Sequence, residues 1–218
     1  MVGTGENSTR SGGPSTPSPH SAGIQPYYAL NAEDLGQRYE SVSFKDVHKA
    51  VLDLLPPIPA KALDVGAGTG RDAAALAERG YEVVAVEPVN ELRQVAQHLH
   101  PGEGIRWATD ALPALSRLEG TFDLVLLSAV WMHLPPSQRE QAMERLTVLL
   151  APSGLLVVSL RRGDPPTDRM MFDVPAQEVV RAGEQTGLQT VRVVEEGTDQ
   201  LGRATVWWQT VALRKEGA

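Results

Sequence analysis

The chain contains no cysteine, and this absence excludes disulfide bonds, thiolate metal sites and a cysteine nucleophile. Its five histidines are scattered, so no metal site is predicted. Basic residues are in the minority, with 20 Lys and Arg against 27 Asp and Glu, whereas a polynucleotide-binding protein needs a positively charged stripe. No apolar run approaches the roughly 18 residues of a membrane span. We therefore expect a cytoplasmic protein with neither nucleic acid nor a membrane as its partner.

The first part of the chain is poor in apolar side chains. Residues 1–25 are rich in Gly, Ser, Thr and Pro, which is typical of a disordered tail. The rest of the chain, residues 26–218, has the length and hydrophobicity of one domain, as a monomer or a homodimer. Within it, residues 26–57 show helical spacing of apolar side chains, continuous from Asn31 to Leu55. This spacing predicts a helical cap before the main fold.

Short apolar strands then alternate with helices, as in a doubly wound parallel sheet. The expected strands cover residues 62–65, 81–86, 105–108, 122–127, 155–160, 190–195 and 205–213. The expected helices cover residues 73–80, 89–99, 138–150 and 176–186. The loop at 196–204 is too short for a helical crossover between parallel strands. The sequence therefore predicts an α/β, Rossmann-like, seven-stranded sheet with helices on both faces, mostly parallel with an antiparallel last strand.

A glycine-rich turn, residues 66–70 (GAGTG), follows the first expected strand. Such a turn lets a ligand approach the backbone and points helix N-terminal amides at it. No Gly-Lys-Ser/Thr follows, so this is not a P-loop, and Arg71 stands where the dinucleotide fingerprint needs a small residue. The carboxylate of Asp64 would repel a pyrophosphate and attract a cation. The pattern favours a cationic nucleotide without phosphate over a nicotinamide or flavin cofactor.

Two further acids stand at the ends of the next strands. Glu87, followed by Pro88, can accept hydrogen bonds from both hydroxyls of a ribose. Asp110 can accept a hydrogen bond from the exocyclic amine of an adenine, with Ala111 and Leu112 against the ring. Because the carboxyl ends of parallel strands meet at one edge of a sheet, the three acids and the glycine turn together indicate a nucleotide site.

The segment from Leu63 to Gly70 resembles the first motif of class I S-adenosylmethionine-dependent methyltransferases of the small-molecule type, and the resemblance extends over residues 27–213. The acids Glu87 and Asp110 and the stretches 122–128 and 149–159 match later motifs in order. The resemblance implies S-adenosyl-L-methionine as cofactor and S-adenosyl-L-homocysteine as product. Related enzymes also close over the cofactor with a tyrosine, which Tyr28 matches here. The residues assigned to the cofactor are Asp64, Gly66, Ala67, Gly68, Gly70, Glu87, Pro88, Asp110, Ala111, Leu112, Ser128 and Tyr28.

The methyl acceptor is expected outside the strand ends, near residues 128–134. His133 is the candidate base, since its ordinary pKa of about 6.5 suits proton transfer, or else it packs or orients the substrate. Trp131 forms either an apolar or cation-π wall of the site or part of the core. In the last strand, Trp207 and Trp208 point to opposite faces, one toward the core and the other toward an edge or interface.

Arg161 and Arg162 end the fifth expected strand, where they either hold an acceptor carboxylate or phosphate or are solvated. Residues 163–173 form a candidate lid. The leading hypothesis is in-line methyl transfer to an O, N or S atom of a small molecule. Methylation of RNA or protein is the alternative if Arg169 joins the other two arginines in a basic patch, and a non-catalytic S-adenosylmethionine-binding module is another. The acceptor itself is not encoded in motifs shared by a fold.

Overall fold

The computed structural model describes residues 24–102, 104–196 and 199–217. Its strands are β1 Lys61–Val65, β2 Glu82–Val86, β3 Ile105–Ala108, β4 Phe122–Ser128, β5 Leu150–Arg162, β6 Leu188–Glu196 and β7 Trp207–Lys215. Its helices are α1 Gln25–Leu30, α2 Ala32–Glu40, α3 Phe44–Val47, α4 Arg71–Glu78, α5 Asn90–Leu99, α6 Pro136–Leu149 and α7 Ala176–Gln185, with the 3-10 helices η2 Leu52–Leu54 and η3 Trp131–His133. None of the helices described is long and apolar enough to cross a membrane.

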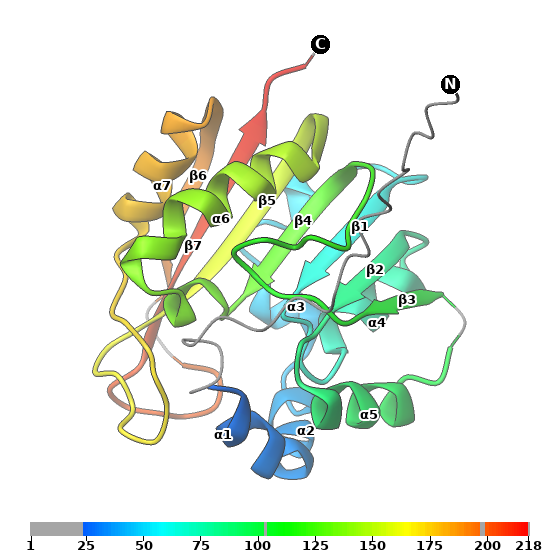
Figure 1. Ribbon diagram of the computed structural model, residues 1–218, viewed down its shortest axis with the longest axis vertical. Coiled ribbons are helices and arrows are strands. Elements are labelled where there is room, and N and C mark those ends of the chain that lie inside the picture. The colour runs from blue at the N-terminus through cyan, green and yellow to red at the C-terminus, as the bar shows by residue number, and fades with distance from the viewer. Residues whose placement is uncertain (1–23, 103, 197–198, 218) are drawn as a thin grey trace, which may run out of the picture.

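The seven strands form one sheet in the order β3-β2-β1-β4-β5-β7-β6. Every neighbouring pair from β3 to β5 is parallel, while β7 lies antiparallel between β5 and β6 (Figure 1). The predicted fold class, including the reversed last strand, is confirmed. The chain crosses from one side of β1 to the other between β3 and β4, which makes the β1–β4 boundary the switch point where ligands of such sheets bind.

Side chains alternate between the two faces of the sheet and bury both. Along β4, Val125 and Leu127 belong to the core cluster that includes α6 and α7, whereas Leu124 and Leu126 belong to the cluster that includes α4. Figure 1 shows α6 and α7 in front of the sheet and α4 behind it. Each buried leucine contributes about 1.5–3 kcal/mol. This two-sided burial is why β4 is apolar almost throughout.

The N-terminal cap lies below the carboxyl ends of the parallel strands, with α1 and α2 beside α5 (Figure 1). Leu35 of α2 packs there against Leu92 of α5. The predicted continuous helix from Asn31 to Leu55 is wrong, because the helix ends with α2 and the chain turns before α3. Ser43 starts a new helix, with its Oγ accepting a hydrogen bond from the Asp46 amide at 3.1 Å. A serine that satisfies the first free amides of a helix favours such a restart over continuation.

Two other boundaries bear on the predictions. The predicted tail falls on residues 1–25, of which 1–23 lie outside the described residues, and α1 begins at Gln25. Strand β5 starts before the predicted residue 155, because Leu150 pairs with Phe122 of β4 ahead of a register shift. The carboxyl end of β5 extends to Arg162, so both predicted arginines lie at the edge of the sheet that faces the cap.

Candidate cofactor and acceptor site

A cavity of about 290 Å³ lies at the switch point, between the carboxyl ends of the strands and the N-terminal cap. Its lining comes from β1, β2, β4, β5 and β7, from the first two helices, and from the loops that follow β5 and β6. The predicted site residues that line it are Asp64, Gly66, Ala67, Gly68, Glu87, Pro88, Asp110, Ala111, Leu112, Ser128, Tyr28, His133 and Arg161. The fold thus brings together residues that are more than a hundred positions apart in sequence. Their roles toward a ligand stay predictions.

The glycine loop is fixed against β2 by its own backbone. The amides of Gly66 and Ala67 both donate to the carbonyl oxygen of Val86, at 2.7 and 2.9 Å. Gly66 has a φ of 70°, and a Cβ there would lie 2.6 Å from Cγ2 of Val130. Gly68 has a φ of 56°, and a Cβ there would meet no atom within 4 Å. The loop therefore needs glycine for its left-handed turns and presents bare backbone to open space, as a cofactor cradle requires.

Glu87 connects this loop to the start of α5. Its Oε2 accepts from the Gly68 amide and its Oε1 from the Val89 amide, both at 2.9 Å. Burial raises the pKa of Glu87 to about 7, although these two hydrogen bonds oppose the change. A carboxylate has about four acceptor positions, so two remain for a ligand. This geometry suits an acid that receives ribose hydroxyls.

Asp64 is the most unusual acid in the site. It is 1% exposed, and its Oδ2 is buried without a hydrogen-bond donor among the described residues. Burial, followed by the charge of Asp72, raises its pKa well above the ordinary value. Asp72 itself accepts from His48 Nε2 at 2.9 Å and Arg71 Nε at 2.7 Å, and these two hold its pKa low against the effect of burial. An unsatisfied buried acceptor costs about 1–3 kcal/mol, which a cationic ligand group would recover.

Asp110 has a partly structural role. Its Oδ1 accepts from the Ala111 amide at 2.8 Å and its Oδ2 from the Arg117 amide at 2.7 Å. The carboxylate thereby holds the turn that carries Ala111 and Leu112 against the cavity. Each oxygen retains a second lone pair, so the predicted contact with an adenine amine is compatible with this turn.

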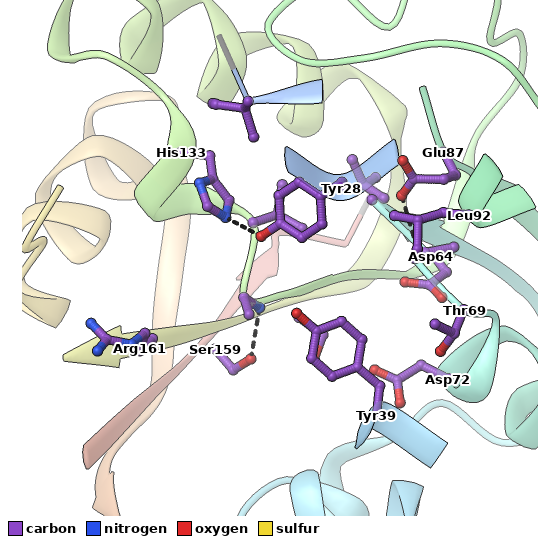
Figure 2. A pocket seen from close by; sticks show the side chains of 18 of the residues that line it. Tyr28, Tyr39, Asp64, Thr69, Asp72, Glu87, Leu92, His133, Ser159 and Arg161 are labelled. Carbon is purple, nitrogen blue, oxygen red and sulfur yellow. Dashed lines mark hydrogen bonds between the residues drawn. The ribbon is translucent and has the colours of Figure 1, made fainter. Parts of the chain in front are cut away.

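Tyr28 and His133 meet at the centre of the cavity (Figure 2). His133 Nδ1 lies 2.9 Å from the carbonyl oxygen of Met170, which only accepts, so Nδ1 carries the proton. His133 Nε2 then accepts from the Tyr28 hydroxyl at 3.0 Å. Burial lowers the pKa of His133 and raises that of Tyr28, which keeps both groups neutral. These bonds connect the cap, η3 and the loop after β5 over the cavity.

The opposite end of the cavity carries guanidinium groups. In Figure 2, Arg161 lies across the cavity from Asp64 and Glu87. Arg169 and Arg203 also line the cavity, from the loops after β5 and β6. The cavity therefore has an acidic end over β1 and β2 and a basic end over β5 and β7.

Three predicted site residues do not line the cavity. Trp131 is fully buried in the core, so it forms no wall of the site. Arg162 turns away, since its guanidinium bonds Asp173 at 2.6 Å and Gln209 at 2.5 Å. Gly70 sits under α5, where a Cβ would lie 3.1 Å from His100. It shapes the loop through its φ of 87° and contributes no cavity surface.

Several lining residues carried no sequence motif. Tyr39 comes from α2, and Asp199 and Arg203 come from the β6–β7 loop. Trp208 was expected at the core or at an edge, yet it lines the cavity and donates from Nε1 to Asp199 at 2.9 Å. Only the placement of β7 beside β5 brings this loop to the site, and the sequence signal for that placement was the short β6–β7 connection. No group of three or more His, Asp or Glu suited to a metal occurs among the described residues.

Comparison with known proteins agrees with this geometry. A methyltransferase-domain family model matches residues 63–158. An uncharacterised methyltransferase of Mycobacterium tuberculosis (strain H37Rv) is 30% identical over 146 residues, which cover 59% of this chain and 58% of that relative. The chain therefore spans 58% of the length of the curated relative that it matches there.

Two solved structures share the fold over nearly the whole chain. The Burkholderia thailandensis 1,6-didemethyltoxoflavin-N1-methyltransferase superposes with a TM-score of 0.71 at 22% identity, covering 94% of this chain and 93% of its own. The [4+2]-cyclase SpnF superposes with a TM-score of 0.69 at 15% identity, covering 96% and 100%. The sheet order is that of a Rossmann-like fold, in which the glycine loop and the strand-end acids form the predicted nucleotide site. Over residues 63–158 the chain matches a methyltransferase domain and is similar to S-adenosylmethionine-dependent methyltransferases.

Proposed function

We propose that this chain transfers a methyl group from S-adenosylmethionine to an oxygen, nitrogen or sulfur atom of a small molecule. The observation that carries the proposal is the unpartnered Asp64 Oδ2, buried beside a glycine loop at the switch point of the sheet. A buried acceptor of this kind matches the positive charge of a sulfonium and an ammonium group. The family match over residues 63–158 supports the same donor.

The residues of the acidic end fit the parts of that donor. Asp64 and the bare backbone at Gly68 would hold the methionine portion, Glu87 the ribose, and Asp110 with Leu112 the adenine. When bound, the donor supplies a methyl group on a sulfonium, which is already activated for displacement. The protein then has to align the acceptor and exclude water, and alignment alone contributes about 7–11 kcal/mol in favourable cases.

His133 is the group that would remove a proton from the acceptor. Its Nδ1 proton is fixed by the Met170 carbonyl, which leaves Nε2 as the acceptor that faces Tyr28. The lowered pKa of His133 keeps Nε2 unprotonated near neutral pH. An acceptor hydroxyl that replaces the Tyr28 hydroxyl at Nε2 would donate its proton to the same lone pair. When no acceptor is bound, Tyr28 would occupy this position at Nε2 and close the cavity from the cap.

The enclosure of the site supports a small acceptor. The cap residues Tyr28 and Tyr39 and the loop residues Arg169 and Met171 all line the cavity, and the loop meets the cap where the Arg169 guanidinium lies 4.4 Å from the Tyr27 ring centre. The chain as a whole has a net charge of -7, which disfavours a polyanion. The alternative of an RNA acceptor required a basic patch that included Arg162, and that side chain is engaged with Asp173.

The first experiment is a calorimetric titration with S-adenosylmethionine and S-adenosylhomocysteine, with NADH as the control. We expect micromolar affinity for the first two compounds and none for NADH. Failure of both to bind would refute the proposal. Because one structural neighbour is named a [4+2]-cyclase, formation of S-adenosylhomocysteine must then be measured with a library of small hydroxy, amino and thiol acceptors. Binding without turnover across such a library would indicate a non-catalytic module.

A further inference from the structure

The arginine cluster of Arg161, Arg169 and Arg203 is the feature of the cavity that donor binding leaves unexplained. Arg161 lies at the end of β5, Arg169 in the loop before α7, and Arg203 in the loop before β7. All three line the cavity. Strands β5 and β7, which carry or precede these segments, lie on the other side of the switch point from β2 and β3. The acids predicted to bind the methyl donor follow β2 and β3.

Among the described residues, no carboxylate is bonded to the buried side chain of Arg161. It is 8% exposed, and its Nη1 donates to the carbonyl oxygens of Gly163 and Asp164, at 3.3 and 3.0 Å, and to the Met171 sulfur at 3.8 Å. Its Nε is buried and has no hydrogen-bond partner among the described residues. Burying a cation in this way is costly unless an anion completes the site.

The neighbouring guanidinium groups increase this unbalanced charge. Burial, and then the charges of Arg203 and Arg169, lower the pKa of Arg161, while the charges of Asp199 and Asp164 partly oppose this change. The Nε of Arg169 is also buried without a partner, although its Nη1 bonds the half-exposed Asp168 at 2.8 Å. Arg203 is already neutralised by Asp199, at 2.7 Å. Two buried N–H groups, on Arg161 and Arg169, therefore have no acceptor among the described residues, and both side chains line the same cavity.

A different arginine lies near the residues that are predicted to hold the methionine part of the donor. Arg71 lines the cavity at its acidic end, where the charge of Asp64 acts on it. The donor's ammonium and carboxylate can therefore be matched by Asp64 and Arg71, close to the glycine loop. In Figure 2, His133, the candidate base, lies on the same side of the cavity as Arg161, across from Asp64 and Glu87. An anion bound by Arg161 would thus be carried by the molecule that also reaches His133.

Building on the proposed function, we infer that the methyl acceptor is a small molecule with a carboxylate or phosphate group, which Arg161 and Arg169 bind at the basic end of the cavity. A guanidinium donates to two oxygens of either group in a fixed fork. The anion fixes the orientation of the acceptor, and the nucleophilic atom lies toward His133.

The test uses benzoate, phenyl phosphate and the neutral benzyl alcohol as probes of the full-length protein, with and without saturating S-adenosylhomocysteine, in low-chloride buffer. We expect the anions to bind and benzyl alcohol to bind far more weakly, and the preferred anion identifies carboxylate or phosphate. Arg161→Gln should weaken anion binding by about 30-fold or more, the effect of removing one partner of a buried charge pair. Affinity for S-adenosylhomocysteine should be unchanged.

Arg162→Gln is the matched control, since the neighbouring side chain points away from the cavity. It should leave anion affinity unchanged. Equal binding of benzyl alcohol, no binding of either anion to the wild type, or equal losses in both variants would overturn the inference. If Arg161→Gln weakened S-adenosylhomocysteine instead, Arg161 would belong to the donor site and the inference would also fail. If the wild type binds anions but not S-adenosylhomocysteine, the proposed function fails because the donor does not bind, and this outcome is distinct from the loss of anion binding that would overturn the inference.

Discussion

The two ends of the cavity differ in charge and in how the chain builds them. The acidic end comes from β1 and β2 and from the turns that follow β1, β2 and β3, all within residues 64–112. The basic end comes from β5, β7 and two loops, which span residues 161–210. These segments lie together because β7 is placed between β5 and β6 in the sheet. The first end is local in sequence and the second depends on tertiary structure.

The two ends also differ in how their buried charges are satisfied. At the acidic end, Glu87 and Asp110 are held by backbone amides, so their positions are fixed before any ligand binds. At the basic end, Arg161 is held by carbonyl oxygens that leave its charge unbalanced. The contrast is that the backbone preorganises the acidic end, which is the proposed donor site. The basic end, which is the proposed acceptor site, relies on side chains, and such side chains can differ between proteins of one fold.

The largest expected effect lies at the boundary between the two ends. His133→Ala should lower kcat for a hydroxyl acceptor by about 100-fold or more, since general-base catalysis contributes about 10²–10⁴-fold. Affinity for S-adenosylhomocysteine, measured by calorimetry, should stay the same. Tyr28→Phe is the control, because it removes the hydroxyl at Nε2 and keeps the imidazole. If His133→Ala retains turnover at every pH, alignment alone explains catalysis.

The next effect sharpens the acidic end. Glu87→Ala should weaken binding of S-adenosylhomocysteine by about 1.5–3 kcal/mol, the range for hydrogen bonds to a charged group. Part of this loss reflects the loop, because the Gly68 and Val89 amides lose their acceptor. Glu82→Ala on the same strand is the control, since that side chain is 72% exposed. Unchanged affinity in Glu87→Ala would remove this residue from the ribose role.

Sequence reasoning was strongest where a motif is contiguous. The seven-stranded, mostly parallel sheet was predicted from the alternation of strands and helices, and its reversed last strand from one short loop. The residues of the acidic end were predicted from a glycine turn and strand-end acids. Gly70 was the exception at that end, because its neighbours in sequence suggested cavity surface and its contacts under α5 depend on packing. The break after α2 was missed because apolar spacing continued across Ser43, and local capping overrode it.

The sequence predicted only part of the basic end. Arg161 and Arg162 are adjacent, so alternation in β5 dictates that they point to different sides, yet sequence alone does not say which one faces the cavity. Neither Arg203 nor Trp208 was assigned to the cavity from the sequence, because their position depends on the pairing of β7 with β5. Trp131 was ambiguous from the start, and burial in the core resolves it.

A pH titration tests whether the acidic end responds to protons. The pKa of Glu87 is about 7 in the ligand-free protein, and its ionised form accepts the ribose hydroxyls best. Binding of S-adenosylhomocysteine should therefore tighten as pH rises to 7 and then level off, with affinity at pH 6 about ten-fold weaker than at pH 8. Because the folded pKa exceeds the ordinary value of 4.5, the ligand-free protein should lose stability as the pH rises from about 4.5 to about 7. Glu87→Gln should abolish both trends, and a flat wild-type profile would show that Glu87 is already ionised.

The smallest expected effect separates the two neighbouring arginines at the basic end. Arg162→Gln should lower the free energy of unfolding by about 1 kcal/mol, because it removes the ion pair with Asp173 and the stacking 4.8 Å from the Trp207 ring centre. Arg161→Gln removes a buried charge that has no carboxylate partner, so it should be neutral or stabilising in the ligand-free protein. Denaturant titration of both variants measures the difference. A larger loss in Arg161→Gln than in Arg162→Gln would mean that Arg161 stabilises the fold, and the unbalanced charge of the basic end would then need another explanation than ligand binding.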